Sequence, residues 1–290
     1  MEDLGRVLTA MVTPFDENFS VDYKKAAQLA QMLENNGSEG IVVSGTTGES
    51  PTLSFEEKIK LYETVREAVS EKTYVIAGTG SNSTENTIKL TKEAEAVGVN
   101  GIMAVVPYYN KPSQEGLYQH FKAVAASTKL PVMLYNVPSR TSLNMKPETV
   151  YRLSQIDNIV ALKEANNDVE QVTEIKRICP SDFKIYSGND SFTLPILSLG
   201  GYGIVSVASH IAGNEIKEMI TQFIRGNFEN ALEIHIKLFP LFKVLFIASN
   251  PVPVKAALKL KGFDVGGVRL PLVNLTEQEL EVLKKTLESY

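Results

Sequence analysis

The sequence has few of the residues and patterns that mark secreted, membrane or nucleic-acid-binding proteins. Its 290 residues include a single cysteine, Cys179, so no disulfide can form within the chain and a reducing compartment is expected. No apolar run comes near the roughly 18 residues that a membrane-spanning helix needs. Lys and Arg total 29 against 34 Asp and Glu, and this net charge of −5 disfavours binding to nucleic acids or anionic membranes. Glu2 and Asp3 stand where a secretory signal would carry positive charge, so we expect a cytoplasmic protein.

Signals for metals and nucleotides are also missing. The three histidines, His120, His210 and His235, are far apart and do not have the spacing of metal ligands. Gly78-Thr79-Gly80 lacks the third glycine of a dinucleotide-binding fingerprint, and no Gly-Lys-Ser/Thr of a phosphate-binding loop follows Gly45. We therefore expect no metal and no organic cofactor.

Short runs rich in β-branched residues alternate with longer segments that have helical spacing, and the alternation repeats eight times. Strands that alternate with helices form parallel sheets, because each connection must cross back over the sheet. Eight such units within about 220 residues favour a closed (β/α)8 TIM barrel over an open doubly wound sheet. The predicted strands are Val7–Val12, Gly40–Val43, Tyr74–Ala77, Gly101–Val106, Val132–Tyr135, Ile159–Leu162, Phe183–Tyr186 and Gly203–Val207.

Helix signals fill the intervals between the strands and the end of the chain. Ser54 and Glu57 form a capping-box pattern, and Pro147 suits the first turn of a helix. From about Gly226 onward the strand alternation stops and only helical spacing remains. The sequence therefore predicts an α/β protein with two parts: a catalytic barrel, residues 1–225, and a small C-terminal α-helical domain, residues 226–290.

Lys163 directly follows the apolar run of the sixth predicted strand and is the most informative residue. Active sites of such barrels lie at the C-terminal ends of the strands, so its ammonium group should project into the barrel mouth. A partly desolvated lysine amine attacks carbonyl carbons and forms a Schiff base. The alternative is a lysine that pairs with Glu164 or extends to water. The residue pattern alone leaves both open.

Hydroxyl groups follow other strands. Gly45-Thr46-Thr47-Gly48 could hold a small carboxylate with its backbone N–H groups and relay protons with its hydroxyls, or it could be an ordinary turn. Tyr135 ends the fifth strand and is either a proton donor and acceptor or an amphipathic core residue. Tyr108 and Tyr109 are consecutive at the end of the fourth strand, so at most one should face the site. Arg140 either clamps a carboxylate or is a solvated loop residue.

Several motifs occur in matching order over almost the whole chain. Through them the sequence resembles the dihydrodipicolinate synthases, within the family of pyruvate-dependent class I aldolases. The motifs that carry this resemblance are Thr9–Phe15, Gly45–Ser50, Pro107–Pro112, Gln114–His120, Tyr135–Thr141, Leu162–Ala165, Ser187–Asp190, Asn250–Lys255 and Arg269–Leu272.

The resemblance implies a role for each candidate. Lys163 forms a Schiff base with pyruvate. Thr46, Tyr109 and Tyr135 form a proton relay, in which Tyr135 is the acid/base and Tyr109 reaches in from a neighbouring subunit. Thr47 binds the pyruvate carboxylate, and the backbone of Val205 packs against the bound pyruvate. Arg140 binds the carboxylate of L-aspartate 4-semialdehyde.

The same resemblance implies the reaction and the assembly. A pyruvate enamine adds to L-aspartate 4-semialdehyde in the diaminopimelate pathway to lysine, without metal or cofactor. The expected assembly is a homo-oligomer, with a tetramer built as a dimer of dimers. Lysine feedback is expected to be weak or absent, because Pro51, Phe55, Lys58 and Asn86 replace the residues that lysine-inhibited relatives typically carry.

Two other functions remain as alternatives. Another pyruvate-dependent lysine aldolase, such as a sialic acid or sugar-acid lyase, shares the lysine and the tyrosine. Those enzymes typically carry Ser-Thr or Gly-Thr in place of Gly45-Thr46-Thr47 and lack an arginine at the position of Arg140, so both features favour the synthase. The second alternative is a catalytically silent, pyruvate-binding protein with the same barrel. The presence of Lys163, Tyr135 and Thr46 argues against it, because such a protein has no chemical need for all three.

Overall fold

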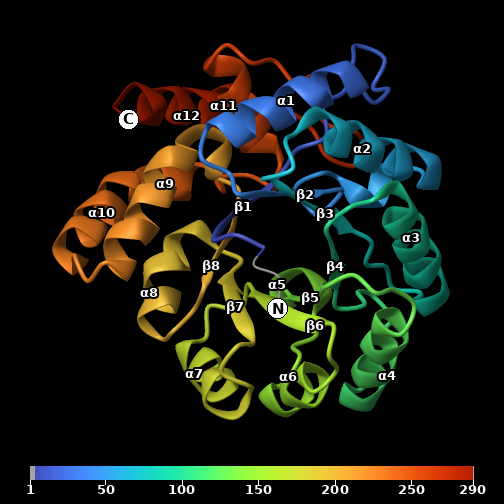
Figure 1. Cartoon of the computed structure of the whole chain (residues 1–290). Helices are drawn as coiled ribbons and strands as arrows, with labels where there is room; N and C mark the ends of the chain where they lie inside the picture. Colours follow the sequence, from blue (N-terminus) through green and yellow to red (C-terminus); the bar gives the residue numbers. More distant parts are fainter. Residues whose placement is uncertain (1–3, 290) are drawn as a thin grey trace.

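The computed structural model describes residues 4–289, and its eight parallel strands close into one barrel in sequence order (Figure 1). The predicted (β/α)8 barrel is confirmed. The sequence placed all eight strands correctly and misplaced some ends by one or two residues. The strands are β1 Val7–Ala10, β2 Gly40–Val43, β3 Tyr74–Gly78, β4 Gly101–Val105, β5 Val132–Asn136, β6 Ile159–Glu164, β7 Lys184–Ser187 and β8 Gly203–Ser206.

The strands are buried on both faces, which explains their continuous apolar runs. Successive side chains alternate between the barrel interior and the helical shell. In β1, Leu8 belongs to the inner cluster, whereas Val7 packs in the outer core under the helices. The inner cluster also contains Val42, Met103 and Val205, contributed by three other strands. A packed interior of this kind restricts any substrate site to the mouth of the barrel.

Helices surround the barrel, and their buried faces and N-terminal caps agree with the sequence predictions. Ala26, Leu29, Ala30 and Leu33 are the buried residues of the first helix, as their spacing predicts. The Ser54–Glu57 capping box is present with both of its reciprocal hydrogen bonds. The elements between strands are α1 Tyr23–Asn35, η1 Ser50–Thr52, α2 Phe55–Ala68, α3 Thr84–Val97, α4 Gln114–Ala125, α5 Pro138–Thr141, α6 Pro147–Ser154, α7 Val169–Ile178, η2 Asp190–Phe192, α8 Thr193–Ser198 and, after β8, α9 Ser209–Ile224.

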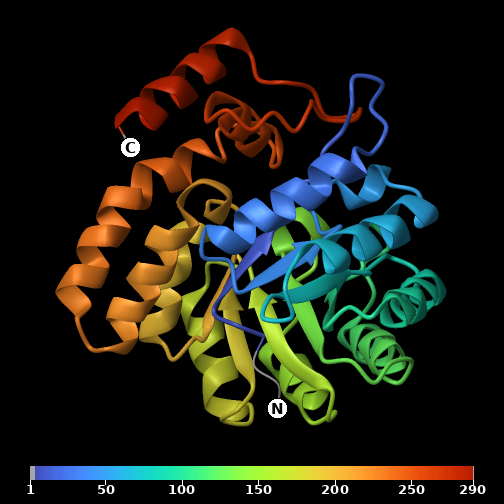
Figure 2. The ribbon, with the colours of Figure 1, turned by 45° about the horizontal axis from the view of Figure 1, so that its top comes forward.

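Three further helices complete the chain: α10 Phe228–Val244, α11 Val252–Leu260 and α12 Glu277–Ser289. Helix α10 packs against α9, and α12 packs against both α10 and α11. Figure 2 shows α10 and α12 on the side of the molecule away from α3 and α4. The predicted boundary at residues 225–226 falls in the turn between α9 and α10, and the division into two domains stays a prediction. Within residues 4–289, no helix combines the length and the apolar character needed to cross a membrane.

Candidate active site

Lys163 and Tyr135 are neighbours at the C-terminal ends of β6 and β5. The parallel register pairs the two residues directly, and the Lys163 ammonium nitrogen lies 4.0 Å from the centroid of the Tyr135 ring. Both side chains are almost fully buried, with exposed fractions of 5% and 4%. No ion pair joins Lys163 to Glu164 in the part of the chain that the structure describes, and the amine is too buried to extend into bulk water. Lys163 instead lines the cavity at the mouth of the barrel.

The loop after β2 turns sharply and presents two threonines. Ser44 and Glu49 bracket it, and both adopt the left-handed backbone that non-glycine residues seldom use, with φ of 57° and 56°. Gly78 of β3 allows this turn, because a Cβ there would lie 2.5 Å from the Ser44 carbonyl oxygen. Thr47 is buried and Thr46 is half-buried. The turn is thus more constrained than an ordinary strand-to-helix connection.

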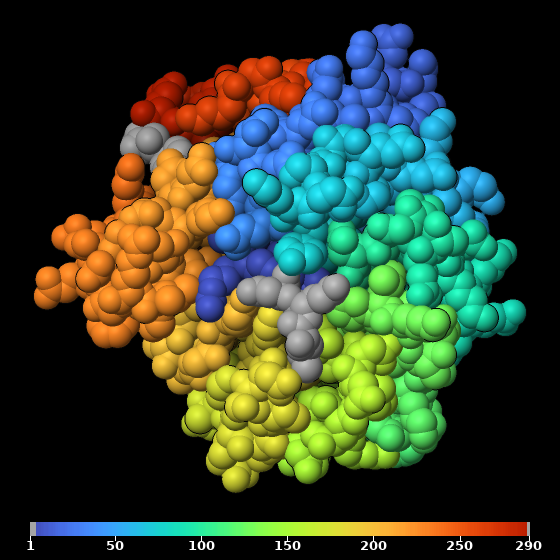
Figure 3. Space-filling view, viewed as in Figure 1, coloured from blue at the N-terminus to red at the C-terminus, as the bar shows by residue number. Residues whose placement is uncertain are grey.

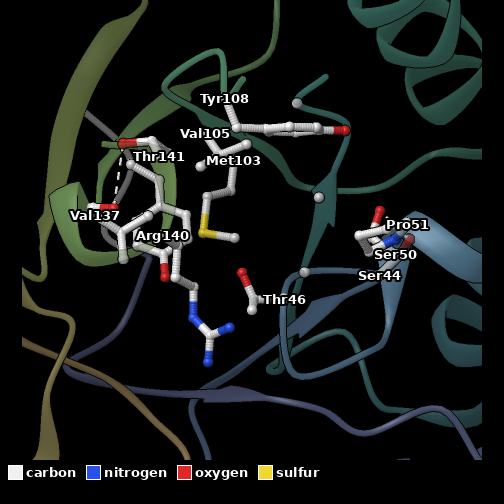
Figure 4. Close-up of a pocket in the computed structure, with 14 residues that line it drawn as sticks. Ser44, Thr46, Ser50, Pro51, Met103, Val105, Tyr108, Val137, Arg140 and Thr141 are labelled. Atoms are coloured by element: carbon white, nitrogen blue, oxygen red, sulfur yellow. Dashed lines mark hydrogen bonds between the residues drawn. The ribbon is translucent and has the colours of Figure 1, made fainter. Parts of the chain in front are cut away.

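One cavity of about 840 Å³ opens at the barrel mouth and brings five predicted site residues together: Lys163, Tyr135, Thr46, Thr47 and Arg140. A smaller cavity of about 240 Å³ continues from Thr46, Tyr135 and Arg140 toward Ser44, Met103 and Tyr108. Figure 4 shows this smaller cavity, in which the Arg140 guanidinium and the Thr46 side chain project into the same open space. Arg140 belongs to the short helix α5 and is exposed.

Two predicted site residues lie outside these cavities. Val205 is buried in β8, in the inner barrel cluster together with Tyr135. Tyr109 is 90% exposed and follows β4 in a loop, where its φ is 73°. Strand β4 ends at Val105, so the prediction that Tyr108 and Tyr109 are strand residues was wrong. Tyr108, rather than Tyr109, lines the smaller cavity.

Glu164 lies in a buried network of amides. Its carboxylate accepts hydrogen bonds from the side chains of Asn136 and Gln171 and from the backbone N–H of Asn166 at 2.7 Å. Burial raises the pKa of Glu164 to about 7, and these hydrogen bonds oppose that rise. Because Asn136 and Glu164 directly follow Tyr135 and Lys163, the network holds the ends of β5 and β6 in register.

Asp190 is a second buried carboxylate close to the lysine. It accepts hydrogen bonds from the Ser206 hydroxyl and from the backbone N–H groups of Val207 and Ala208. Burial raises the pKa of Asp190, while those hydrogen bonds and the positive charge of Lys163 lower it. Sequence reasoning found the strand end that carries Asp190 but gave the residue no role.

Asn250 was also missed as a contact of the site. Its amide nitrogen donates a hydrogen bond to the Thr47 hydroxyl at 2.9 Å, and both side chains are buried. The two residues are 203 positions apart, so no local pattern could reveal the contact. Among residues 4–289, no three His, Cys, Asp or Glu side chains are grouped closely enough to hold a metal ion.

Comparisons with known proteins cover nearly the whole chain. The model of the dihydrodipicolinate synthetase family matches residues 3–290. A 4-hydroxy-tetrahydrodipicolinate synthase from Desulforamulus reducens is 60% identical over 288 residues, covering 99% of this chain and 97% of that protein. The synthase of the same name from Bacillus subtilis is 57% identical over 286 residues, covering 98% and 99%.

Solved structures of similar proteins have the same fold. A dihydrodipicolinate synthase from Bacillus anthracis superposes with a TM-score of 0.98 at 54% identity, covering 100% of this chain and 99% of the other. A synthase from Cyanidioschyzon merolae, solved with lysine bound, gives a TM-score of 0.97 at 49% identity, covering 99% and 98%.

Proposed function

The chain belongs to the dihydrodipicolinate synthetase family, and from this premise we propose how the residues of the barrel mouth divide the reaction. The protein is a lyase whose function is that of a 4-hydroxy-tetrahydrodipicolinate synthase, in diaminopimelate and lysine biosynthesis. Its relatives favour this function over that of a sialic acid or sugar-acid lyase. The substrates that we propose are pyruvate and L-aspartate 4-semialdehyde.

Lys163 is the nucleophile of the first step. Its uncharged amine adds to C2 of pyruvate, water leaves, and the resulting imine loses a proton from C3 to become an enamine. The observation that carries this assignment is the buried Lys163 amine, 4.0 Å from the Tyr135 ring at the mouth of the barrel. Tyr135 and Thr46 pass the protons, together with Tyr109 of a neighbouring subunit.

The remaining residues bind the two carboxylates. Thr47 holds the pyruvate carboxylate, and the Val205 backbone packs on the bound pyruvate. Arg140 pairs with the carboxylate of the semialdehyde, for which its exposed position on α5 is suited. The enamine carbon attacks the aldehyde, and the amine of the second substrate then displaces Lys163 and closes the ring. None of these steps needs a metal or an organic cofactor.

Replacing Lys163 with alanine tests the nucleophile. We expect Lys163→Ala to lose turnover and to stop the covalent trapping of pyruvate by borohydride, while the fold persists, because the residue lies at the mouth and outside the packed layers. Mass spectrometry of the trapped protein and circular dichroism measure the two effects. Trapping that survives in the variant would place the nucleophile elsewhere.

Arg140→Ala tests the division between the two substrates. A charge-assisted contact to a carboxylate contributes about 1.5–3 kcal/mol, so kcat/KM for aspartate semialdehyde should fall at least tenfold. The rate of pyruvate trapping should change little, because Arg140 serves only the second substrate. Equal losses in the two half-reactions would contradict the assignment. Assay with sugar acids in place of the semialdehyde separates the synthase from the other aldolases.

We also propose a cytoplasmic homotetramer, a dimer of dimers. The 90% exposure of the Tyr109 side chain supports a role for it at another subunit. A stripe of exposed apolar residues on α10 offers a second contact surface; it consists of Phe228, Leu232, Ile236 and Phe239. In the space-filling view, α10 forms an outer edge of the molecule (Figure 3).

A further inference from the structure

Lys255 of α11 and Glu49 form an ion pair in the protein interior, and Glu49 ends the loop after β2, residues 44–49, called the threonine loop below. The ammonium nitrogen lies 2.7 Å from a carboxylate oxygen, and the two side chains are only 3% and 1% exposed. The residues are far apart in the sequence, and the proposed mechanism uses neither of them. Two charges removed from water need further polar partners if their burial is to be tolerated.

Both charges have such partners. The Lys255 ammonium donates a hydrogen bond to the Gly267 carbonyl at 2.7 Å and lies 4.1 Å from the centroid of the Phe15 ring. The second oxygen of Glu49 accepts a hydrogen bond from the backbone N–H of Arg269 at 2.9 Å. Burial lowers the pKa of Lys255 to about 8, while Glu49 acts to raise it. The C-terminal segment, residues 250–269, therefore contacts both carboxylate oxygens of Glu49.

Arg269 extends this contact beyond the loop, to η1 and α2. Its guanidinium donates to both carboxylate oxygens of Glu57, at 2.9 and 2.6 Å, and to the carbonyl of Thr52 at 2.7 Å. Glu57 is the third residue of α2, and its carboxylate accepts a hydrogen bond from the backbone N–H of the N-cap residue, Ser54. The C-terminal segment is thus fixed to both the threonine loop and the helix that follows it.

The threonine loop needs such support, because Ser44 and Glu49 hold a strained left-handed backbone at its two ends. Strained backbone persists only where the surrounding contacts determine it. Asn250, from the same C-terminal segment, donates to the Thr47 hydroxyl oxygen. Since that oxygen accepts this hydrogen bond, its own proton can be donated to a carboxylate in the cavity.

We propose that the Lys255–Glu49 ion pair is a positioning element: it fixes the backbone of the threonine loop, and with it the hydroxyl that receives the pyruvate carboxylate. This inference rests on the proposed function, because it assigns the pair an effect on pyruvate. The two residues act through Thr47 and do not touch the substrate themselves. The pair therefore affects how tightly the free enzyme binds pyruvate.

The test compares Lys255→Met with Glu49→Gln and with the variant that carries both changes. We expect KM for pyruvate to rise at least fivefold in Lys255→Met, because an unpaired buried carboxylate pulls the loop toward water. The rate of borohydride trapping at subsaturating pyruvate should fall by the same factor. KM for aspartate semialdehyde at saturating pyruvate should change less than twofold. The double variant should recover part of the loss, since it removes the unpaired charge.

Lys259→Met is the matched control. It removes an ion pair from the same helix, but the Lys259–Asp264 pair is exposed, with side-chain exposures of 69% and 52%. Its kinetic constants should equal those of the parent. If Lys255→Met fails to fold, Glu49→Gln, which keeps the shape of the side chain, gives the same readout.

A lowered melting temperature with an unchanged KM for pyruvate would overturn the proposal, because the pair would then serve stability alone. So would an equal rise in KM for both substrates. A parent enzyme that traps no pyruvate would instead refute the proposed function, so the two failures are distinguishable.

Discussion

His210 is held in one neutral tautomer by two backbone groups. Its Nε2 accepts a hydrogen bond from the N–H of Val12 at 3.1 Å, and its Nδ1 lies 2.8 Å from the Val207 carbonyl oxygen. A carbonyl can only accept, so Nδ1 carries the proton. The ring thereby links the segment that follows β1 to the segment that follows β8, the strand that contains Val205. Protonation of Nε2 would remove the acceptor for Val12.

Acid should therefore destabilise the fold through this residue. Burial lowers the pKa of His210 from 6.5 to about 4. Between these two values the unfolded chain binds a proton that the folded chain does not, so the free energy of unfolding falls as the pH falls. One such group contributes up to about 1.4 kcal/mol per pH unit.

Urea unfolding between pH 7 and pH 4 measures this dependence. His210→Gln should be less stable than the parent at neutral pH but should lose stability less steeply on acidification. His120, also buried with its pKa lowered to about 4, contributes a parallel slope in both proteins and so does not affect the comparison. Identical slopes in parent and variant would show that His210 does not titrate in this range.

Single residues could be predicted from the sequence where their role depends on local position. The sequence located Lys163 and Tyr135 correctly at the mouth because each follows or ends an apolar run, and in this fold the strand ends lie at the mouth. Asn250 and Lys255 were not given roles, because their partners Thr47 and Glu49 lie about two hundred positions away. No periodic pattern in the sequence indicates such a contact, because the two partners belong to distant elements that only the folded chain brings together.

At the scale of elements, η1 and the start of α2 bear on regulation. Pro51 stands near the start of η1, Phe55 is the first residue of α2, and Lys58 follows one turn later. The ammonium group of Lys89, on the neighbouring helix α3, lies 4.6 Å from the centroid of the Phe55 ring. Burial lowers the pKa of Lys58, so a second cation beside it would be opposed by repulsion in a poorly solvated place.

We therefore predict that L-lysine inhibits this enzyme weakly or not at all. Activity measured at increasing L-lysine should reach half its starting value only well above the millimolar range. Lys58→His, which reduces the positive charge at neutral pH, should make the enzyme more sensitive than the parent. Half-inhibition of the parent at submillimolar lysine would show that these residues form a competent lysine site.

Elements were predictable where burial is complete and local. Apart from Tyr74, Val105 and Lys184, which are half-buried, the strand residues are buried, so their apolar runs were unambiguous. The sequence failed at Tyr108 and Tyr109, because β4 ends at Val105 and the chain then turns through a left-handed residue. On α10, Leu241 and Phe242 are buried, whereas Phe239 is exposed and belongs to the proposed contact surface.

At the scale of the whole molecule, counting strands predicted the barrel. It could not show whether one chain supplies every residue of the proposed site. One chain supplies the amine, one phenol, two threonines and the arginine to a single cavity. The remaining phenol of the proposed relay, Tyr109, is exposed and lines neither of the two cavities at the mouth of its own barrel. The proposed mechanism therefore needs a second copy of the chain.

Mixing two inactive variants tests this requirement. In a mixed dimer of Tyr109→Phe and Lys163→Ala, the site that retains Lys163 receives an intact Tyr109 from its neighbour, whereas the other site lacks both. Each pure variant should be nearly inactive. Dissociation and reassembly of an equal mixture should make half of the dimers mixed, with one competent site in each, and restore about a quarter of the parent activity.

The control carries both substitutions in one chain and is mixed with the parent. There, each mixed dimer again holds one intact lysine, but the neighbour that this lysine faces carries the Tyr109→Phe change, so activity should fall below the fraction of parent chains present. Activity in the first mixture that never exceeds the mean of the two pure variants would show that each chain contains a complete site. Tyr109 would then lose its role, and the 90% exposed ring would need another partner.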